Sequence, residues 1–473
     1  MELDYPNNLY DIIEQTYKEK NNEPLATYHY CLIKVLKKHH MWPALQVKKF
    51  KNNNDLVLLH NSYDKKDVDE KFQTIYHQCR SVILDFSLYL GENIVVVSYA
   101  NNIPVRININ EYTQIVNDAD KYQEAYDGTM VTVYNYKDEW YFGTSTCTDI
   151  NYSKFAHPTK SHGDMFNEIL MNIYSSCFTE EEIINSDDTT IENKLRNLFV
   201  SNLDKSIAYE FVLIHHENNH IIDYSEVYGK DYKFIYHINS KNRVSLCEED
   251  IHQGPLANIG VLYPTHFSSL NDAYNHINTN KSYGFIVKKI CDDGVKLFKI
   301  SPVEISIKED TDPCKPNIWH NLLIIYMKNK KEFKISDYIN MYNPDLELPK
   351  DNNNRNIDPT YLIHTTISTF KDILYNLYMM TTTYNPKTNR FKMNKEIDAQ
   401  FPPIIRFHLA QLRHRQINNH NGTMIKPTDV YYYICKCNII KNIKLLVAFF
   451  ATSSGFNIPD RASICLSTLD SLL

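Results

Sequence analysis

The chain has 473 residues, a formal net charge of −7, and 43% hydrophobic and 23% charged residues. These values are ordinary for a globular protein of two or three domains, and the negative net charge argues against indiscriminate binding to nucleic acids. No segment approaches the roughly 18 consecutive apolar residues that a membrane-spanning helix needs, so we expect no membrane partner.

Two further features of the composition bear on compartment and source. The first residues are acidic and polar, which does not fit a secretory signal, and the 10 cysteines show no Cys-x-x-Cys spacing. We therefore interpret the cysteines as reduced core thiols and predict a cytoplasmic location, in the host cytoplasm or in the virion if the protein is viral. The presence of 35 Tyr against 11 Gly is typical of AT-rich coding sequences, such as those of some parasites and large DNA viruses.

The first 44 residues have apolar side chains at helical spacing and predict an N-terminal helical extension. From Leu45 the apolar period changes to two, and Asn- and Asp-rich turns separate the segments. Strands are predicted at 45–50, 55–61, 81–86, 93–99, 139–146, 206–214, 219–228, 231–238, 283–290 and 294–301. Helices are predicted between them at 161–178 and 190–203. The region 45–308 is therefore predicted to be an α+β domain.

The segment 308–317 is polar and contains proline, which predicts a linker, and the pattern after it is almost wholly helical. The predicted helices are 317–333, 360–380, 402–417 and 427–450. We therefore expect a helical C-terminal domain over 309–473. From Trp319 onward the formal charge is about +7, against about −14 for the preceding part. This asymmetry suggests a basic interaction module appended to an acidic body, although a merely solvated helix surface would give the same composition.

Five short motifs follow one another in the α+β region. They are HQCRSVILDF (77–86), AYDGTMVTVY (125–134), SIAYEFVLIHHENNHIIDY (206–224), SYGFIV (282–287) and DDGVKLFKIS (292–301). In order and spacing they resemble the bacteriophage RNA ligase 1 family, which belongs to the ATP-dependent nucleotidyltransferase superfamily of ligases and capping enzymes. The resemblance implies a nucleotidyltransferase domain of RNA-ligase type with ATP-grasp-like antiparallel sheets, followed by an all-helical C-terminal domain.

The resemblance also implies a nucleotide or RNA pocket, with ATP and Mg²⁺ as its cofactors if the pocket is functional. In such enzymes a lysine attacks the α-phosphate and holds AMP, carboxylates position a divalent metal, and cations stabilise the triphosphate. The positions that match the family pattern are Arg80, Asp127, Gly128, Glu210, Gly284 and Lys299.

Other positions depart from the family pattern where its chemistry resides. Ala125 stands at the position of the nucleophilic lysine, and Ser145 stands where a second lysine is expected. Tyr283 replaces a metal-linked glutamate, and Ser301 replaces the second lysine of the final motif. Upstream, NNIPVRININEY (101–112) stands where a Lys-Phe-Phe-Asn stretch is expected, which leaves Arg106 as the only nearby cation. These losses predict a catalytically inactive homologue, without a catalytic or metal-binding residue that we can name, that acts by binding RNA or a protein.

Two alternatives stay open. The chain could be an active RNA ligase or RNA repair enzyme with a displaced nucleophile, such as Lys288, Lys296 or Lys299, or one that acts on pre-adenylated RNA ends. It could also be a structural or assembly protein of a large DNA virus.

Two polar clusters lie outside these motifs or beside them. His215, His216 and His220 lack a cysteine cluster or a paired carboxylate, so we interpret them as solvated loop histidines rather than a metal site. Arg406 and Arg413, together with Arg415, form a basic face on the predicted helix 402–417. This face is a candidate for RNA binding through the phosphate backbone, and an ordinary exposed helix surface is the alternative.

Overall fold

The computed structural model describes most of the first 311 residues and parts of the remainder. The described residues are 6, 8–51, 53, 56–62, 70–88, 96–154, 159–179, 187–218, 220–249, 256–280, 282–291, 294–311, 321–322, 325–326, 335–342, 356, 358–385, 390–401, 403–419 and 424–436. The chain divides into two compact units, Met1–Glu309 and Asp310–Leu473, and each is described by itself.

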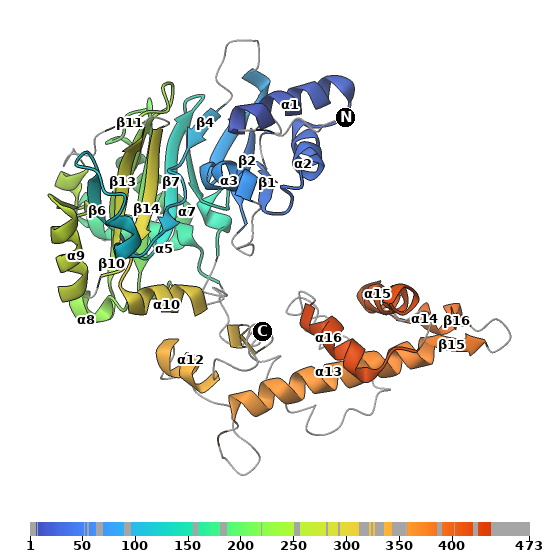
Figure 1. Ribbon diagram of the computed structural model, residues 1–473. Coiled ribbons are helices and arrows are strands. Elements are labelled where there is room, and N and C mark those ends of the chain that lie inside the picture. Colours follow the sequence, from blue (N-terminus) through green and yellow to red (C-terminus); the bar gives the residue numbers. More distant parts are fainter. Residues whose placement is uncertain are drawn as a thin grey trace. The chain divides into compact units, whose positions relative to one another are not determined.

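The first unit begins with two helices that share a core with a four-stranded antiparallel sheet (Figure 1). Asn8 and Thr27 cap the helices by accepting backbone hydrogen bonds in their first turns. The elements are α1 (Leu9–Asn22), α2 (Tyr28–Lys38), β1 (Leu45–Lys49), β2 (Leu56–Asn61), η1 (Glu70–Phe72), α3 (Gln73–Gln78), β3 (Val82–Asp85), η2 (Phe86–Leu88) and β4 (Val96–Tyr99). The sheet order is β1-β2-β3-β4, so β1 lies at one edge.

A five-stranded antiparallel sheet of order β11-β10-β9-β7-β8 follows. Its elements are β7 (Thr129–Tyr136), β8 (Glu139–Thr144), η3 (Ile150–Tyr152), α5 (His162–Ile173), η4 (Ser175–Cys177), α7 (Asp188–Val200), β9 (Ile207–His215), α8 (Ser225–Tyr228), β10 (Lys233–Asn242) and β11 (Glu248–Glu249). Lys137 and Asp138 both have positive φ, as a tight β7–β8 hairpin requires. One face of the sheet, including Val131 and Phe211, packs against Phe166 and Phe199 of α5 and α7.

The third sheet has the order β12-β6-β13-β14-β5, and its pairs are antiparallel except for β14 with β5. Its elements are β5 (Val105–Arg106), α4 (Ile109–Tyr112), β6 (Lys121–Glu124), η5 (Ala257–Ile259), β12 (His266–Phe267), α9 (Leu270–Thr279), β13 (Phe285–Cys291), β14 (Gly294–Ile300) and α10 (Val303–Thr311). Tyr122, Phe285 and Val287 on one face pack against α4 and α9.

The opposite faces of these two five-stranded sheets are directed toward each other. Because side chains alternate along a strand, Gln123 and Lys299 lie on the face that is not covered by α9. Gln123 Nε2 donates to the Ile238 carbonyl of the neighbouring sheet at 3.3 Å. Tyr126 stacks on Tyr236 with ring centroids 3.7 Å apart. The predicted α+β fold with antiparallel sheets is therefore confirmed.

The second unit is largely helical. Its elements are α12 (Ile335–Tyr342), α13 (Pro359–Thr381), β15 (Thr382–Asn385), β16 (Arg390–Met393), α14 (Lys395–Asp398), α15 (Pro403–Asn419) and α16 (Pro427–Lys436). Asp358 caps α13, whose first residue is Pro359. The helices predicted at 360–380 and 402–417 are present, and the β15–β16 hairpin was not predicted. Most of the predicted helix 317–333, and the part of the helix 427–450 after residue 436, lie outside the described residues.

Two predictions for the first unit are wrong. The segment 219–228 was predicted to be a strand, but among its described residues the structure has a turn followed by the short helix α8. The cysteines were predicted to be core thiols, which holds for Cys31 and Cys79, whereas Cys177 and Cys247 are exposed. In the described residues, no helix combines the length and apolarity needed to cross a membrane.

Candidate functional site

The segment that contains Asp127 and Gly128 connects the two facing sheets. It leaves the third sheet after β6 and enters the second sheet at β7, and Ala125 N donates to the Gly284 carbonyl at 2.9 Å. A Cβ atom on Gly128 would lie 2.5 Å from the Leu213 carbonyl oxygen of β9. Glycine is therefore required at position 128 because the segment passes directly against the neighbouring strand.

Asp127 is used to hold the turn at 220–224. Its carboxylate accepts hydrogen bonds from the backbone amides of Ile221 and Ile222, the latter at 3.1 Å, and the Tyr224 hydroxyl donates to the Asp127 carbonyl at 3.1 Å. Burial raises the pKa of the Asp127 carboxyl group, while the nearby His220 and the two amides oppose that change. These contacts explain why residues 221–222 form a turn instead of the predicted strand.

Lys299 lies in a compact cluster of charged and aromatic groups. Its ammonium is 2.6 Å from Glu309 Oε1 and 3.1 Å from the centroid of the Tyr283 ring. The Tyr283 hydroxyl donates to the same carboxylate at 2.5 Å, and Arg106 Nε lies 3.4 Å from its other oxygen. We call these four residues the Lys299 cluster. Its only anion among the described residues, Glu309 on α10, has a side chain just 3% exposed.

The electrostatics of the Lys299 cluster favour an ion pair at neutral pH. Burial lowers the pKa of Lys299 to about 8, although the attraction of Glu309 opposes this change. The pKa of Glu309 is lowered because Lys299 and the Tyr283 hydroxyl stabilise its charged form more strongly than burial disfavours it. Burial and the nearby carboxylates of Asp127 and Glu309 raise the pKa of Tyr283 far above its usual value, so its hydroxyl stays a donor.

A second group of polar residues surrounds Glu210 on the central strand β9. Glu210 is buried, with 3% exposure, and accepts hydrogen bonds from Asn101 N and Asn239 Nδ2, each at 2.7 Å. Lys241, also buried, directs its ammonium to the Ala100 carbonyl at 3.4 Å and lies 4.2 Å from the Tyr99 ring centroid. Burial lowers the pKa of Lys241, and the charge of Glu210 opposes this.

Arg80 is connected to the Glu210 group only through backbone hydrogen bonds of neighbouring residues. It follows Cys79 at the start of β3, and the next residue, Ser81, accepts a hydrogen bond from Ala100 N at 3.0 Å. Ala100 immediately precedes Asn101, the residue whose amide binds Glu210. Arg80 is half-buried.

The predicted pocket residues thus fall into two groups. Asp127, Gly128 and Gly284 lie where the chain crosses between the sheets, and Asp127 contributes to the field at Lys299. Glu210 is the centre of the second group, and Arg80 is connected to that group only through the backbone hydrogen bond between Ala100 and Ser81. The sequence analysis did not identify Glu309, because it lies in no recognised motif. It also did not identify Lys241, although Lys241 lies two residues after Asn239 on β10 and so has the same strand-face spacing.

The prediction of solvated loop histidines is wrong for His215, whereas His216 and His220 are half-buried. His215 ends β9 and is fully buried, and ligand atoms of His215, His216 and Glu217 lie within 4.8 Å of one another. The ammonium of Lys160 binds both Glu217 and Glu168, the latter at 2.5 Å, and Glu168 lies 3.2 Å from His215 Nε2. A lysine therefore already supplies the positive charge that these carboxylates attract.

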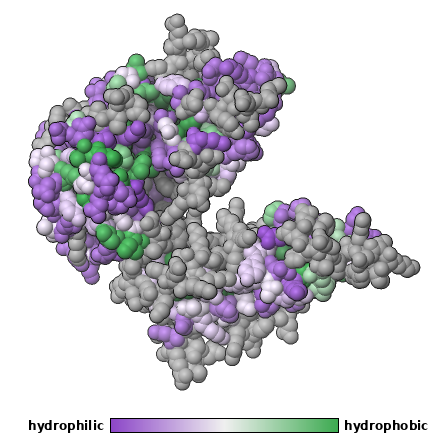
Figure 2. Space-filling model, viewed as in Figure 1, coloured by the Kyte–Doolittle hydropathy of each residue, from purple (hydrophilic) through white to green (hydrophobic). Residues whose placement is uncertain are grey.

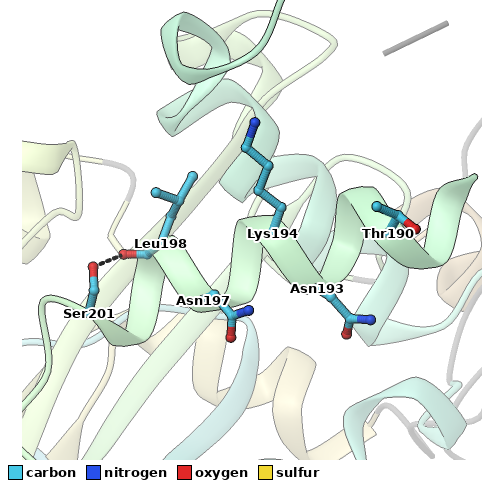
Figure 3. Close-up of a pocket in the computed structure, with 6 residues that line it drawn as sticks. All are labelled: Thr190, Asn193, Lys194, Asn197, Leu198 and Ser201. Carbon is cyan, nitrogen blue, oxygen red and sulfur yellow. Dashed lines mark hydrogen bonds between the residues drawn. The ribbon is translucent and has the colours of Figure 1, made fainter. Parts of the chain in front are cut away.

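A shallow cavity of about 490 Å³ lies apart from both groups, along helix α7 (Figure 3). It is lined by Thr190, Asn193, Lys194, Asn197, Leu198 and Ser201. These residues come from one helix and its C-terminal end, and they include no group that the motifs predicted. We place the candidate site at the facing sheets instead, because buried charges with named partners gather there.

In the second unit, the arginines of α15 differ in their contacts. Arg413 binds Asp398 at 2.6 Å and Thr381 at 2.7 Å, and Arg415 lies 4.9 Å from the Tyr433 ring centroid. Arg406 is exposed. Only part of the predicted basic face is therefore open to solvent.

Comparisons with known proteins give structural likenesses at low identity. The sequence matches no protein-family model and no curated protein. One solved structure, an archaeal ATP-dependent RNA ligase in its form 1, is similar with a TM-score of 0.36 and 11% identity, over 72% of this chain and 79% of that chain. Its form 2 gives a TM-score of 0.35 and 11% identity, over 83% and 96%. Because these TM-scores are low, any function proposed for this chain depends on the residues described above and not on the likeness.

Proposed function

We propose that this protein is an RNA-ligase-type nucleotidyltransferase homologue that does not form a lysine–AMP adduct and acts by binding RNA. The observation that carries the proposal is the ion pair of Lys299 with Glu309, 2.6 Å apart. A cation that must stabilise a triphosphate needs to be free of an internal anion, and here a carboxylate of the same chain neutralises it.

The residues of the facing sheets do not fit ATP with Mg²⁺. The position of the nucleophile is a buried alanine, Ala125. The position of the metal-linked glutamate is Tyr283, whose hydroxyl is engaged by Glu309. Glu210 is held by Asn101 and Asn239. We therefore derive no adenylyl-transfer step for this chain.

RNA is the proposed ligand because the resemblance in sequence is to RNA ligases and because cationic groups are exposed on both units. Arg406 is an example in the second unit. Phosphate contacts of Lys and Arg supply most of the affinity of sequence-independent RNA binding.

A second candidate function, ligase activity with a displaced nucleophile, is favoured by one observation. Burial lowers the pKa of Lys299 to about 8, which increases its unprotonated, nucleophilic fraction. In this alternative Lys299 would carry AMP, and its ion pair with Glu309 would have to break first.

The test is intact mass after incubation with ATP, Mg²⁺ and Mn²⁺, performed on the native protein and on Ala125→Lys. We expect no gain of one AMP in either protein, and RNA binding by the native protein in a parallel anisotropy titration. An AMP adduct on the native chain that Lys299→Arg abolishes would establish the displaced nucleophile instead. An absence of RNA binding at low salt would favour a protein partner or a structural role.

A further inference from the structure

The segment from Lys37 to Lys51 has an unusual charge composition. It contains Lys37, Lys38, Lys48, Lys49 and Lys51 and no Asp or Glu, although the chain as a whole carries a charge of −7. All five side chains are exposed. We call them the β1-edge lysines.

The fold gathers these lysines around the open edge of the first sheet. Lys37 and Lys38 lie in the last turn of α2, which contacts β1. β1 pairs with β2 alone among the strands that the structure describes. Side chains alternate along β1, so Lys49 lies on the face that α2 covers and Lys48 on the opposite face. Figure 2 shows that the end of the unit formed by α1 and α2 is mostly hydrophilic.

The β1-edge lysines have no carboxylate partner, whereas many other lysines of the same unit have one; Lys20, Lys154 and Lys230 also lack one among the described residues. Elsewhere, Lys18 pairs with Glu14, and Lys205 pairs with Asp138 at 2.9 Å. Further pairs involve Lys34, Lys137, Lys160, Lys233, Lys288 and Lys289. No ion pair to any β1-edge lysine occurs among the residues that the structure covers.

The positive field of these lysines reaches neighbouring histidines. Burial lowers the pKa of His29, and the charge of Lys49 lowers it further. The same holds for His39 beside Lys38 and for His60 beside Lys48. Lys38, Lys48 and Lys49 therefore each disfavour positive charge on a neighbouring histidine.

One exposed ring and one half-buried ring, those of Tyr152 and Trp42, accompany the lysines. The Lys51 ammonium lies 3.2 Å from the centroid of the Tyr152 ring, which is 62% exposed, and Lys37 lies 5.9 Å from that of Trp42. The Lys48 ammonium binds the Thr146 carbonyl, so the surface continues from β1 onto the segment after β8. Lysines beside accessible aromatic rings suit single-stranded nucleic acid, whose phosphates need cations and whose bases stack on rings.

The apolar residues of the segment argue against a lipid surface. Met41, Leu45, Val47 and Phe50 are all buried, so none of these four large apolar side chains is available for insertion into a bilayer. A protective role for Lys48 and Lys49 at a sheet edge would not explain the unpaired Lys37, Lys38 and Lys51.

We propose that the β1-edge lysines, with Tyr152 and Trp42, form a binding surface for the phosphate backbone of single-stranded RNA. This inference rests on the proposed RNA-binding function and assigns it a location. The surface lies in the first unit, at a sheet edge remote in sequence from the arginines of α15.

The test compares two triple variants of the full chain in RNA binding. The first is Lys37→Gln/Lys38→Gln/Lys49→Gln, and the control is Lys18→Gln/Lys205→Gln/Lys230→Gln, which changes the net charge equally. A labelled single-stranded RNA of about 20 nucleotides is titrated by fluorescence anisotropy between about 50 and 300 mM NaCl. Each lysine that contacts a phosphate contributes about 0.7 to the magnitude of the slope of log K against log salt concentration. We therefore expect this slope to be shallower by about 2 in the first variant than in the native protein. The control should keep the native slope.

The outcomes separate this inference from the proposed function. If the native protein binds RNA and the first variant binds it with an unchanged slope, the β1-edge surface is not the site, and the proposed function stands. If the native protein binds no RNA at the lowest salt, both fail. Binding of the native protein to phosphatidylserine vesicles but not to RNA, with loss in the first variant, would assign the surface to a membrane and overturn the inference. Equal thermal midpoints of both variants would confirm that folding is intact.

Discussion

The ammonium of Lys299 and the carboxylate of Glu309 lie 2.6 Å apart, and both side chains are almost wholly buried. Lys299 comes from β14 and Glu309 from α10, which follows it in the chain. The cation of the last motif is therefore neutralised by the next helix rather than left for a ligand. This contact also fixes Tyr283, which donates to the same carboxylate.

Replacing Glu309 should lower the stability of the protein. Glu309→Gln leaves the charges of Lys299 and Arg106 without a carboxylate, and loss of one partner from a buried pair is strongly destabilising. We expect the free energy of unfolding at pH 7 to fall by about 3 kcal/mol in urea titrations. Inorganic pyrophosphate should then raise the thermal midpoint of the variant more than that of the native protein, because it replaces the lost anion.

Glu304→Gln is the matched control for this experiment. Glu304 lies on the same helix, its side chain is 77% exposed, and it pairs with Lys308 at 3.4 Å. An exposed pair contributes less than about 1 kcal/mol. A Glu309→Gln protein as stable as this control would contradict the interpretation of the Lys299 cluster.

Stability should fall as the pH drops from neutral to 5, because three buried histidines resist protonation. Burial lowers the pKa of His60, His162 and His237 to about 4 in each case. Between that value and the unfolded pKa of about 6.5, the unfolded chain binds more protons. Each histidine therefore removes about 2 kcal/mol of stability at pH 5 relative to pH 7, and below pH 4 the loss stops growing.

His162→Gln tests this dependence at a single position. His162 contacts Thr129 Oγ1 at 3.1 Å and Ser153 Oγ at 2.8 Å, and glutamine keeps a neutral polar group there at both pH values. Urea midpoints measured at pH 7 and pH 5 should differ less for this variant than for the native protein. The exposed His40→Gln serves as the control, and an equal flattening there would refute the assignment.

Gly284 should be intolerant of any side chain. Its φ is +128°, and an added Cβ would clash with the Ile300 carbonyl and lie 2.9 Å from Ser301 Cα. Gly229 also has a positive φ, +82°, but no atom lies within 4 Å of an added Cβ. A substitution at Gly229 therefore measures the backbone strain without a clash. We expect Gly229→Ala to cost about 1–3 kcal/mol and Gly284→Ala distinctly more, measured as loss of free energy of unfolding. Equal costs would mean that the strands relax around position 284.

The arginines of α15 should separate into structural and surface residues. Arg413→Gln removes a charge-assisted contact to Asp398 at 2.6 Å and should lower the stability of the second unit by about 1–3 kcal/mol. Arg406→Gln changes an exposed side chain and should leave stability within about 0.5 kcal/mol. In RNA titrations, only Arg406→Gln should reduce the salt dependence if α15 contributes to binding.

Much of the fold could be predicted because its patterns are local. The change from helical to alternating spacing at Leu45 marks the start of β1, and the alternation at 206–214 and 283–290 matches β9 and β13. Asp127 and Gly128 were predicted only as a match to a family motif, and the need for glycine at 128 comes from its close approach to Leu213 in the structure. The prediction of a strand at 219–228 was wrong. The apolar residues of this segment belong to a turn held by Asp127, and their composition is the same as that of a strand.

By itself, the sequence determined the α+β class, the order of the motifs and the absence of lysine at position 125, because these depend on residue type and short-range spacing. Only the tertiary structure decided that Lys299 is neutralised by Glu309, that His215 is buried, and that five lysines border one sheet edge without a carboxylate. The physical reason is that charge pairing and burial depend on which strands and helices come together in space. In this chain, those partners lie on neighbouring elements whose contacts no local pattern encodes.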